Sequence, residues 1–256
     1  MSSPLKAIIC GYEKSGTTLL NEILRRHPDM DSGFECGFLL GDSPQDFPGI
    51  QPYYGNFRKT WQLTRQDMHY ICNTDDWQEC YARARERCPF IADKTTGLFD
   101  KTPIYMLHLN AVLNKMPQLP CVVNVRDPRA LFLSWARWSW QENPEQWIND
   151  NFEVNCRRFI SYAEGYRQAL ASHGDRIIVN QFEVFCLNAE KQLEKIFNHL
   201  GLLFDPDYLY FSSRHFVYGN TISDEYVFPY REAFSNELCE RILTATEKYS
   251  EWHYHA

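Results

Sequence analysis

The chain has 256 residues, of which 44% are hydrophobic and 15% aromatic, and this is enough to bury one sizeable core. Such a composition excludes a disordered chain. The formal net charge of -7 excludes a general nucleic-acid binder, which would carry a basic excess. We therefore expect no nucleic-acid partner and expect that any bound anion is held by a local site.

The first residues, MSSPLKAIICGYEK, lead from a short polar tail directly into a short apolar run, without the features of a signal peptide. The sequence contains no apolar stretch near the roughly 18 residues that a membrane span needs. These features predict a soluble, cytoplasmic protein without a membrane partner. The nine cysteines include no C-x-x-C pair, so we expect buried thiols and neither disulfides nor a metal site.

In chain order, residues 6–10 (KAIIC), 121–125 (CVVNV) and 176–180 (RIIVN) are rich in β-branched side chains and predict strands. A helical pattern follows each strand, which favours a parallel sheet. No repeat, low-complexity tract or linker interrupts the chain. We therefore predict an α/β fold with a central parallel β-sheet flanked by helices, in a single domain covering residues 1–256.

Helix signals are clear in two places. Residues 103–116 predict a helix that begins at Pro103 after the capping residue Thr102. Residues 188–200 carry an apolar face and predict a second helix, with Gly201 suited to a left-handed residue after its end.

Residues 41–92 lack a sustained period and contain many prolines, glycines and aromatic residues. We predict an irregular segment with short helices. It is interpreted as a cover over an acceptor site, while ordinary peripheral packing of its aromatic residues remains the alternative.

The segment GYEKSGTT follows the first predicted strand and leads into the helical pattern TTLLNEILRR. Backbone N–H groups and the positive helix end would converge there on an anion. A nucleoside-triphosphatase loop has a lysine after its second glycine, where this chain has Thr17. Its lysine is Lys14, inside the loop, where the ammonium could reach a terminal anionic group.

Several segments resemble the sulfotransferases that use 3'-phosphoadenosine 5'-phosphosulfate (PAPS). They are KSGTT, RRHPD, the glutamate in SGFECGFL, DKTPIY and VVNVRDPRALFLSW, in this order. The resemblance implies a fold like that of P-loop nucleotide-binding proteins. It also implies that the loop binds the 5'-phosphosulfate, through residues Lys14, Ser15, Gly16, Thr17 and Thr18.

The resemblance further implies that Arg126 and Ser134 hold the 3'-phosphate of PAPS. Both can face one crevice beyond the strand end, although an Arg–Asp pair that fixes a turn would also explain Arg126. Arg214 and Gly219, in SSRHFVYGN, are further candidates for nucleotide binding. The following GNTISDEY departs from the family's proline and basic residue, which leaves their contribution open.

Glu35 matches the catalytic glutamate of several sulfotransferase branches, so the resemblance implies that it is the general base. Lys101 in DKTP resembles the lysine that approaches the transferring group, and we rank it above Lys94 in DKTT. No histidine stands in the motif of the histidine-dependent branch, and His108 is interpreted as structural.

We therefore predict a PAPS-dependent sulfotransferase that releases adenosine 3',5'-bisphosphate (PAP) and needs no metal. The acceptor is expected to be a small molecule with a hydroxyl or amine, near aromatic residues such as Tyr53, Tyr54, Trp61 and Trp138. The alternatives are a Mg²⁺-dependent P-loop kinase and a catalytically inactive nucleotide-binding protein. Assembly into a homo-oligomer is left open.

Overall fold

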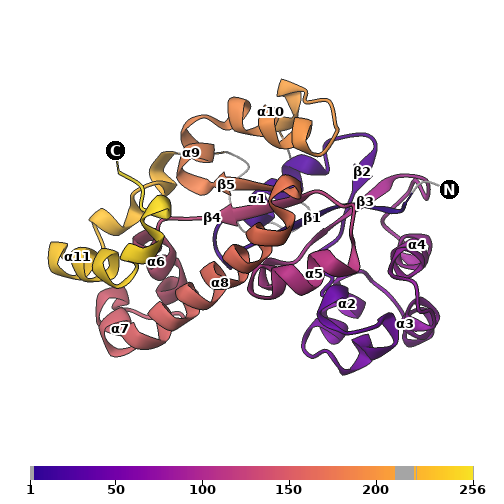
Figure 1. Ribbon diagram of the computed structural model, residues 1–256, viewed down its shortest axis with the longest axis horizontal. Helices are drawn as coiled ribbons and strands as arrows, with labels where there is room; N and C mark the ends of the chain where they lie inside the picture. The colour runs from indigo at the N-terminus through magenta and orange to yellow at the C-terminus, as the bar shows by residue number, and fades with distance from the viewer. Residues whose placement is uncertain (1–2, 211–221, 223, 256) are drawn as a thin grey trace.

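The computed structural model describes residues 3–210, 222 and 224–255. Five strands form one sheet with the order β2-β3-β1-β4-β5, in which all neighbours are parallel (Figure 1). They are β1 (Leu5–Gly11), β2 (Met30–Asp31), β3 (Gly97–Lys101), β4 (Cys121–Val125) and β5 (Ile177–Gln181). The predicted α/β fold with a central parallel sheet is confirmed.

The three predicted strands are present as β1, β4 and β5. The bounds of β4 are those predicted, and the bounds of β1 and β5 each differ from the prediction by one residue. The sequence did not predict β2 and β3. Strand β3 has the sequence GLFDK. Its last two residues are charged, so the sequence does not show the apolar pattern of a buried strand, yet all five residues are buried. Because β3 joins one side of β1 and β4 the other, the ends of these strands border the crevice where α/β sheets bind ligands.

Helices cover both faces of the sheet (Figure 1). Residues of α1, α9 and α10 form one hydrophobic cluster with β1, and residues of α5, α6 and α8 belong to a larger one on the other face. The α-helices are α1 (Thr17–Leu24), α2 (Tyr53–Thr60), α3 (Arg65–Cys72), α4 (Trp77–Arg87), α5 (Leu109–Lys115), α6 (Pro128–Trp138), α7 (Pro144–Asp150), α8 (Phe152–His173), α9 (Phe182–Leu187), α10 (Ala189–His199) and α11 (Asn236–Ala245).

The prediction of one continuous helix over 103–116 is wrong. The chain forms a 3-10 helix, η3 (Pro103–His108), followed by α5. Thr102 was also expected to cap this helix, but its side chain makes no capping bond. Its hydroxyl is engaged by Asp100 and by two backbone N–H groups instead. The predicted end at Gly201 is confirmed by its φ of 70°.

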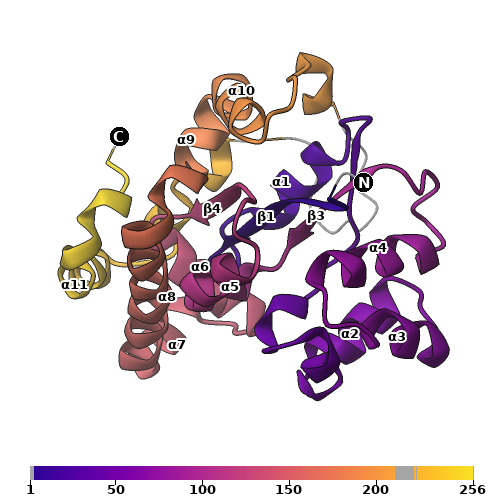
Figure 2. The same cartoon turned by 45° about the vertical axis from the view of Figure 1, so that its right-hand side comes forward.

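Residues 41–92 are more regular than predicted. They form the 3-10 helix η2 (Pro44–Gly49) and the helices α2, α3 and α4, which lie together beside the sheet (Figure 2). Thr64 begins α3 with a capping box, and Asp76 caps α4. Aromatic side chains of this segment, such as Phe47, Phe57 and Trp61, are fully buried.

No helix in the described part of the chain is long and apolar enough to cross a membrane.

Candidate active site

The loop between β1 and α1 is shaped by two residues with positive φ. Gly16, at the start of α1, has a φ of 85°, and a Cβ there would overlap the ring of Phe182. Glycine is therefore required at position 16, because the backbone has a positive φ and because there is no room for a Cβ. Lys14 has a φ of 75°, which is uncommon outside glycine and concentrates at functional sites. The loop thus holds its lysine in a conformation that the surroundings must enforce.

Side chains of α6 and of the residues just before it donate hydrogen bonds to backbone carbonyls of this loop. Trp135 Nε1 donates to Glu13 O at 3.0 Å, and Arg126 Nη1 donates to Lys14 O at 2.9 Å. The Ser15 hydroxyl contacts Tyr12 O at 2.7 Å. It faces the protein, so Ser15 stabilises the loop, whereas Thr17 is buried and Thr18 half-buried at the start of α1.

The ammonium of Lys14 lies 4.6 Å from the ring centroid of Trp138, whose side chain is 54% exposed. Within the described ranges Lys14 forms no salt bridge with a carboxylate. A cation held only by an aromatic face keeps its donors for an anion.

Arg126 and Ser134 come together, as their spacing predicted. Arg126 Nη1 donates to Ser134 Oγ at 3.1 Å, while Nη2 donates to Tyr226 O at 2.9 Å. Ser134 accepts in this bond, so its own proton remains free to donate. Arg126 Nε is buried and has no hydrogen-bond partner among the described residues. This pair therefore keeps donor capacity for an anion beside the loop.

Glu183, the second residue of α9, is completely buried behind Arg126. Its Oε1 lies 3.9 Å from Arg126 Nε and accepts a hydrogen bond from Asp127 N at 3.0 Å. Burial raises the pKa of Glu183 to about 7, although the charge of Arg126 acts in the opposite direction. Burial likewise lowers the pKa of Arg126.

Glu35 and Lys101 meet at the end of β3. Lys101 Nζ lies 3.2 Å from Glu35 Oε1 and 4.3 Å from the ring centroid of Phe34. The Lys101 side chain is 1% exposed, whereas that of Glu35 is 24% exposed. Lys101 pairs in register with Ile9 of β1, two residues before the loop begins. The carboxylate is thus accessible beside a nearly buried ammonium.

Tyr53 links the two parts of the site. Burial raises the pKa of its hydroxyl, and the carboxylates of Glu35 and Glu13 raise it further. Both carboxylates therefore lie within electrostatic reach of this hydroxyl. Glu13 forms a salt bridge of 3.0 Å with Arg158 of α8.

Other predicted residues lie elsewhere. Arg214 and Gly219 fall outside the described residues. Lys94 is exposed and donates to the carbonyls of Arg85 and Cys88. Trp61 is buried and donates to Phe34 O at 2.7 Å, so it supports the Glu35 segment from within the core.

Sequence reasoning did not single out Glu13, Arg158 and Glu183 as site residues. Glu183 stands in the segment VNQFEVF, and its position after a predicted strand was the available signal. Nothing in the local sequence around Arg158, in the first half of the 22-residue helix α8, indicates that it reaches the β1–α1 loop.

The model of the sulfotransferase family matches residues 6–206. This is well over half of the chain, which therefore belongs to the sulfotransferase family. No curated protein matches the sequence.

Solved structures of sulfotransferases share the fold. The chain is similar to the sulfotransferase domain from the Synechococcus PCC 7002 olefin synthase, with a TM-score of 0.67 and 19% identity over 99% of this chain and 95% of that one. The domain from the curacin biosynthetic pathway gives a TM-score of 0.64 and 16% identity over 95% and 98% of the two chains. The sulfotransferase from Alicyclobacillus acidocaldarius gives 0.55 and 17% over 98% and 96%. At such identities the similarity shows the fold alone.

Proposed function

We propose that this protein binds PAPS and transfers its sulfuryl group to a hydroxyl or amine of a small-molecule acceptor. Membership of the sulfotransferase family supports the reaction class. The β1–α1 loop supports binding of the 5'-phosphosulfate, because Lys14 is free of salt bridges in the described ranges and the first turn of α1 lies beside it.

The pairing of Arg126 with Ser134 is the observation that favours PAPS as the sulfuryl donor. These residues form a second anion site that touches the first through the bond from Arg126 to Lys14 O. PAPS has a 3'-phosphate to fill such a site, whereas ATP has none. The free hydroxyl proton of Ser134 and the guanidinium charge of Arg126 suit a phosphate.

The proposed chemistry is an in-line displacement at sulfur. The acceptor oxygen or nitrogen forms a bond to sulfur, and the bond from sulfur to the 5'-phosphate oxygen breaks, so that PAP leaves. Glu35 takes the acceptor proton, since its carboxylate is partly exposed and lies beside Lys101 at the site. Lys14 and Lys101 stabilise the charge on the transferring group and on the leaving oxygen.

We further propose that residues 41–92 form one wall of the acceptor site. Tyr53, at the start of α2, packs on Gly37 close to Glu35. Trp61 at the end of α2 bonds to the backbone of Phe34. Tyr53 and the exposed Trp138 could then contact an apolar or aromatic acceptor from two sides.

Calorimetric titration tests the donor. We expect PAP to bind tightly with or without Mg²⁺ and ATP to bind weakly in both conditions. Arg126→Gln should abolish the preference of the protein for PAP over adenosine 5'-monophosphate, which lacks the 3'-phosphate. Mg²⁺-dependent ATP binding without PAP binding would overturn the proposal in favour of phosphoryl transfer.

The base is tested by turnover with PAPS and three probe acceptors, namely 4-nitrophenol, 2-phenylethanol and 2-phenylethylamine. We expect Glu35→Gln to lower kcat by roughly 10²- to 10⁴-fold, the usual contribution of general-base catalysis, without weakening PAP binding. Glu194→Gln, an exposed position on α10, is the matched control. Full turnover by Glu35→Gln would show that Glu35 is not the base.

A further inference from the structure

The carboxylate of Asp100 lies at the centre of a buried cluster of hydroxyl groups. Asp100 is completely buried at the end of β3, directly before Lys101. Its Oδ2 accepts hydrogen bonds from Tyr81 at 2.5 Å and from Tyr105 at 2.8 Å. Its Oδ1 accepts one from Thr102 at 2.7 Å. A charge this far from water requires such donors.

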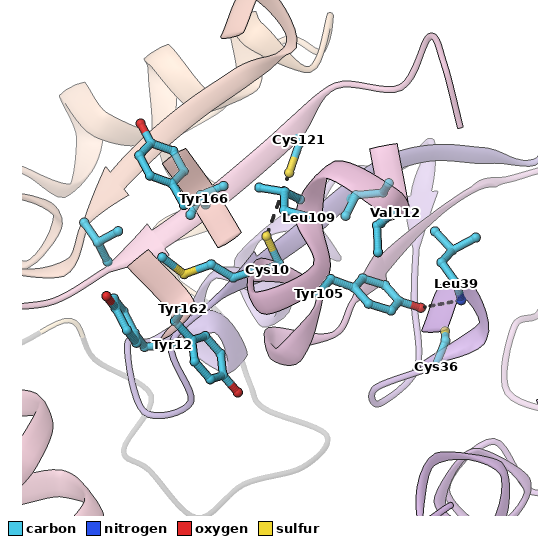
Figure 3. Packing of buried hydrophobic residues seen from close by; sticks show 14 of the residues in the cluster. Cys10, Tyr12, Cys36, Leu39, Tyr105, Leu109, Val112, Cys121, Tyr162 and Tyr166 are labelled. Atoms are coloured by element: carbon cyan, nitrogen blue, oxygen red, sulfur yellow. Dashed lines mark hydrogen bonds between the residues drawn. The ribbon is translucent and has the colours of Figure 1, made fainter. Parts of the chain in front are cut away.

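Each hydroxyl has a single proton, which fixes the direction of the next hydrogen bonds. Thr102 donates its proton to Asp100, so its oxygen can only accept from other groups. It accepts the backbone N–H of Cys36 and of Gly37, both at 3.1 Å. In the same way Tyr105 accepts the N–H of Leu39 at 3.1 Å (Figure 3).

The three N–H groups belong to the segment that directly follows Glu35. Gly37 has a φ of 77°, and a Cβ there would lie 2.6 Å from side-chain atoms of Tyr53. The backbone of this segment is therefore held from both sides. The next residue after Asp100, Lys101, contacts the Glu35 carboxylate itself.

We propose that Asp100 is a positioning residue that sets the place of the Glu35 carboxylate relative to Lys101 through the hydroxyls of Thr102 and Tyr105. The inference rests on the proposed role of Glu35 as the general base. Asparagine could not replace Asp100, because its amide nitrogen would offer a proton where a hydroxyl already donates one. The hydroxyls that face the nitrogen would have to reverse, and the N–H groups beyond Thr102 or Tyr105 would lose their acceptor.

Amide hydrogen exchange, resolved by residue with NMR, tests the hydrogen-bond relay without any acceptor substrate. We expect Thr102→Val to accelerate exchange at Cys36 and Gly37 by about tenfold, as for the loss of an ordinary hydrogen bond, and to leave Leu39 unchanged. Tyr105→Phe should accelerate Leu39 alone. Asp100→Asn should accelerate either Cys36 and Gly37 or Leu39, according to which carboxylate oxygen the amide nitrogen replaces.

This crossed pattern separates the relay from a general loss of stability, which would accelerate all three amides in every variant. Thr246→Val is the matched control for threonine, since its hydroxyl is also buried and donates to a backbone carbonyl. Tyr70→Phe is the control for tyrosine, because its hydroxyl bonds to Glu86 on the surface. Neither control should change exchange at Cys36, Gly37 or Leu39.

Turnover tests the consequence for Glu35, with PAPS and whichever of the three probe acceptors reacts fastest. We expect Thr102→Val to lower kcat by roughly 10- to 100-fold, the cost of displacing a reacting group by about 1 Å, with unchanged PAP affinity. Adding Glu35→Gln to Thr102→Val should lower kcat no further than Glu35→Gln does alone, because both changes act on the same step.

The inference would be overturned if Thr102→Val and Tyr105→Phe each changed exchange equally at all three amides. A kcat of Thr102→Val equal to that of the wild type would also overturn it. If Asp100→Asn is too unstable to purify, the two single-hydroxyl variants decide the question. A wild-type protein that binds no PAP or reacts with none of the probes would count against the proposed function instead, and the exchange pattern would still show whether the relay exists.

Discussion

Two buried carboxylates lie on opposite sides of the central strand β1, and the protein accommodates them differently. Asp100, at the end of β3, accepts hydrogen bonds from three hydroxyl groups. Glu183, just after β5, accepts one from the backbone N–H of Asp127 at Oε1, and its Oε2 has no partner among the described residues. Burial raises the pKa of both, and hydrogen bonds oppose the shift at Asp100.

The difference indicates that the hydrogen bonds of Asp100 fix the geometry around it, whereas the protonation of Glu183 changes with pH. Hydroxyl donors take the place of water around Asp100 and hold the segment after Glu35 in one arrangement. Burial raises the pKa of Glu183 to about 7, because it accepts few hydrogen bonds and Arg126, 3.9 Å away, offsets only part of the shift. We therefore expect the Glu35 side of the site to control turnover and the Arg126 side to control nucleotide binding and its pH dependence.

Apart from that of Glu35→Gln, the largest expected effect comes from removing the cation of the β1–α1 loop. Lys14→Met should lower kcat by roughly 10²- to 10³-fold, the cost of losing one group that stabilises transition-state charge. PAP lacks the transferred group, so its affinity should change much less. Steady-state kinetics and calorimetry measure the two quantities, and Lys195→Met on the exposed side of α10 is the control. An unchanged kcat would remove Lys14 from the mechanism.

A pH series sharpens the contrast at Glu183. Its folded-state pKa of about 7 lies above the ordinary 4.5. Between these values the folded state keeps a proton that the unfolded state has lost. The stability from protonation is therefore complete below about pH 4.5 and is lost as the pH rises through 7, by about 3 kcal/mol in total.

Glu183→Gln mimics the protonated side chain and should be free of this loss. Urea unfolding of the wild type and of the variant, at several pH values between 5 and 8, measures this loss of stability. We expect the free energy of unfolding of the wild type to fall, relative to the variant, as the pH rises. Parallel curves for the two proteins would show that Glu183 does not titrate in this range.

Gly16 and Gly37, two of the glycines with positive φ, test directly whether the two sides of the site have separate roles. Alanine at either position should cost about 2 kcal/mol, because φ is unfavourable and an aromatic ring occupies the space of the Cβ. Gly16→Ala should weaken PAP binding, whereas Gly37→Ala should lower kcat and leave PAP binding intact. Calorimetry and kinetics on both variants measure this. The same loss of PAP affinity in both would contradict the separation.

The smallest expected effect is at Ser134. Ser134→Ala removes one neutral hydrogen-bond donor and should weaken PAP binding by about 1 kcal/mol, or roughly fivefold. Binding of adenosine 5'-monophosphate should not change, because it has no 3'-phosphate. Ser161→Ala, whose hydroxyl bonds within α8, is the control. Equal losses for the two nucleotides would place Ser134 away from the 3'-phosphate.

Local patterns were enough to predict the strands β1 and β4, the turn that leads from β1 into α1 and the proximity of Arg126 to Ser134. They failed for β3, whose polar end DK contradicts its complete burial, and for Thr102, which looked like a helix cap. In both cases contacts with distant segments outweighed the local preference. The hydroxyl of Thr102 bonds to Cys36 and Gly37, more than 60 residues away.

The sequence by itself determined the parallel α/β architecture and the loop at Lys14, because apolar runs and turn residues act over a few neighbouring positions. Only the tertiary structure decided what each carboxylate does. Asp100 meets hydroxyls from α4 and η3, Glu183 meets an arginine that follows β4, and Glu35 meets the last residue of β3. Burial and hydrogen-bond partners set the behaviour of an acid, and both arise from segments that are far apart in the chain.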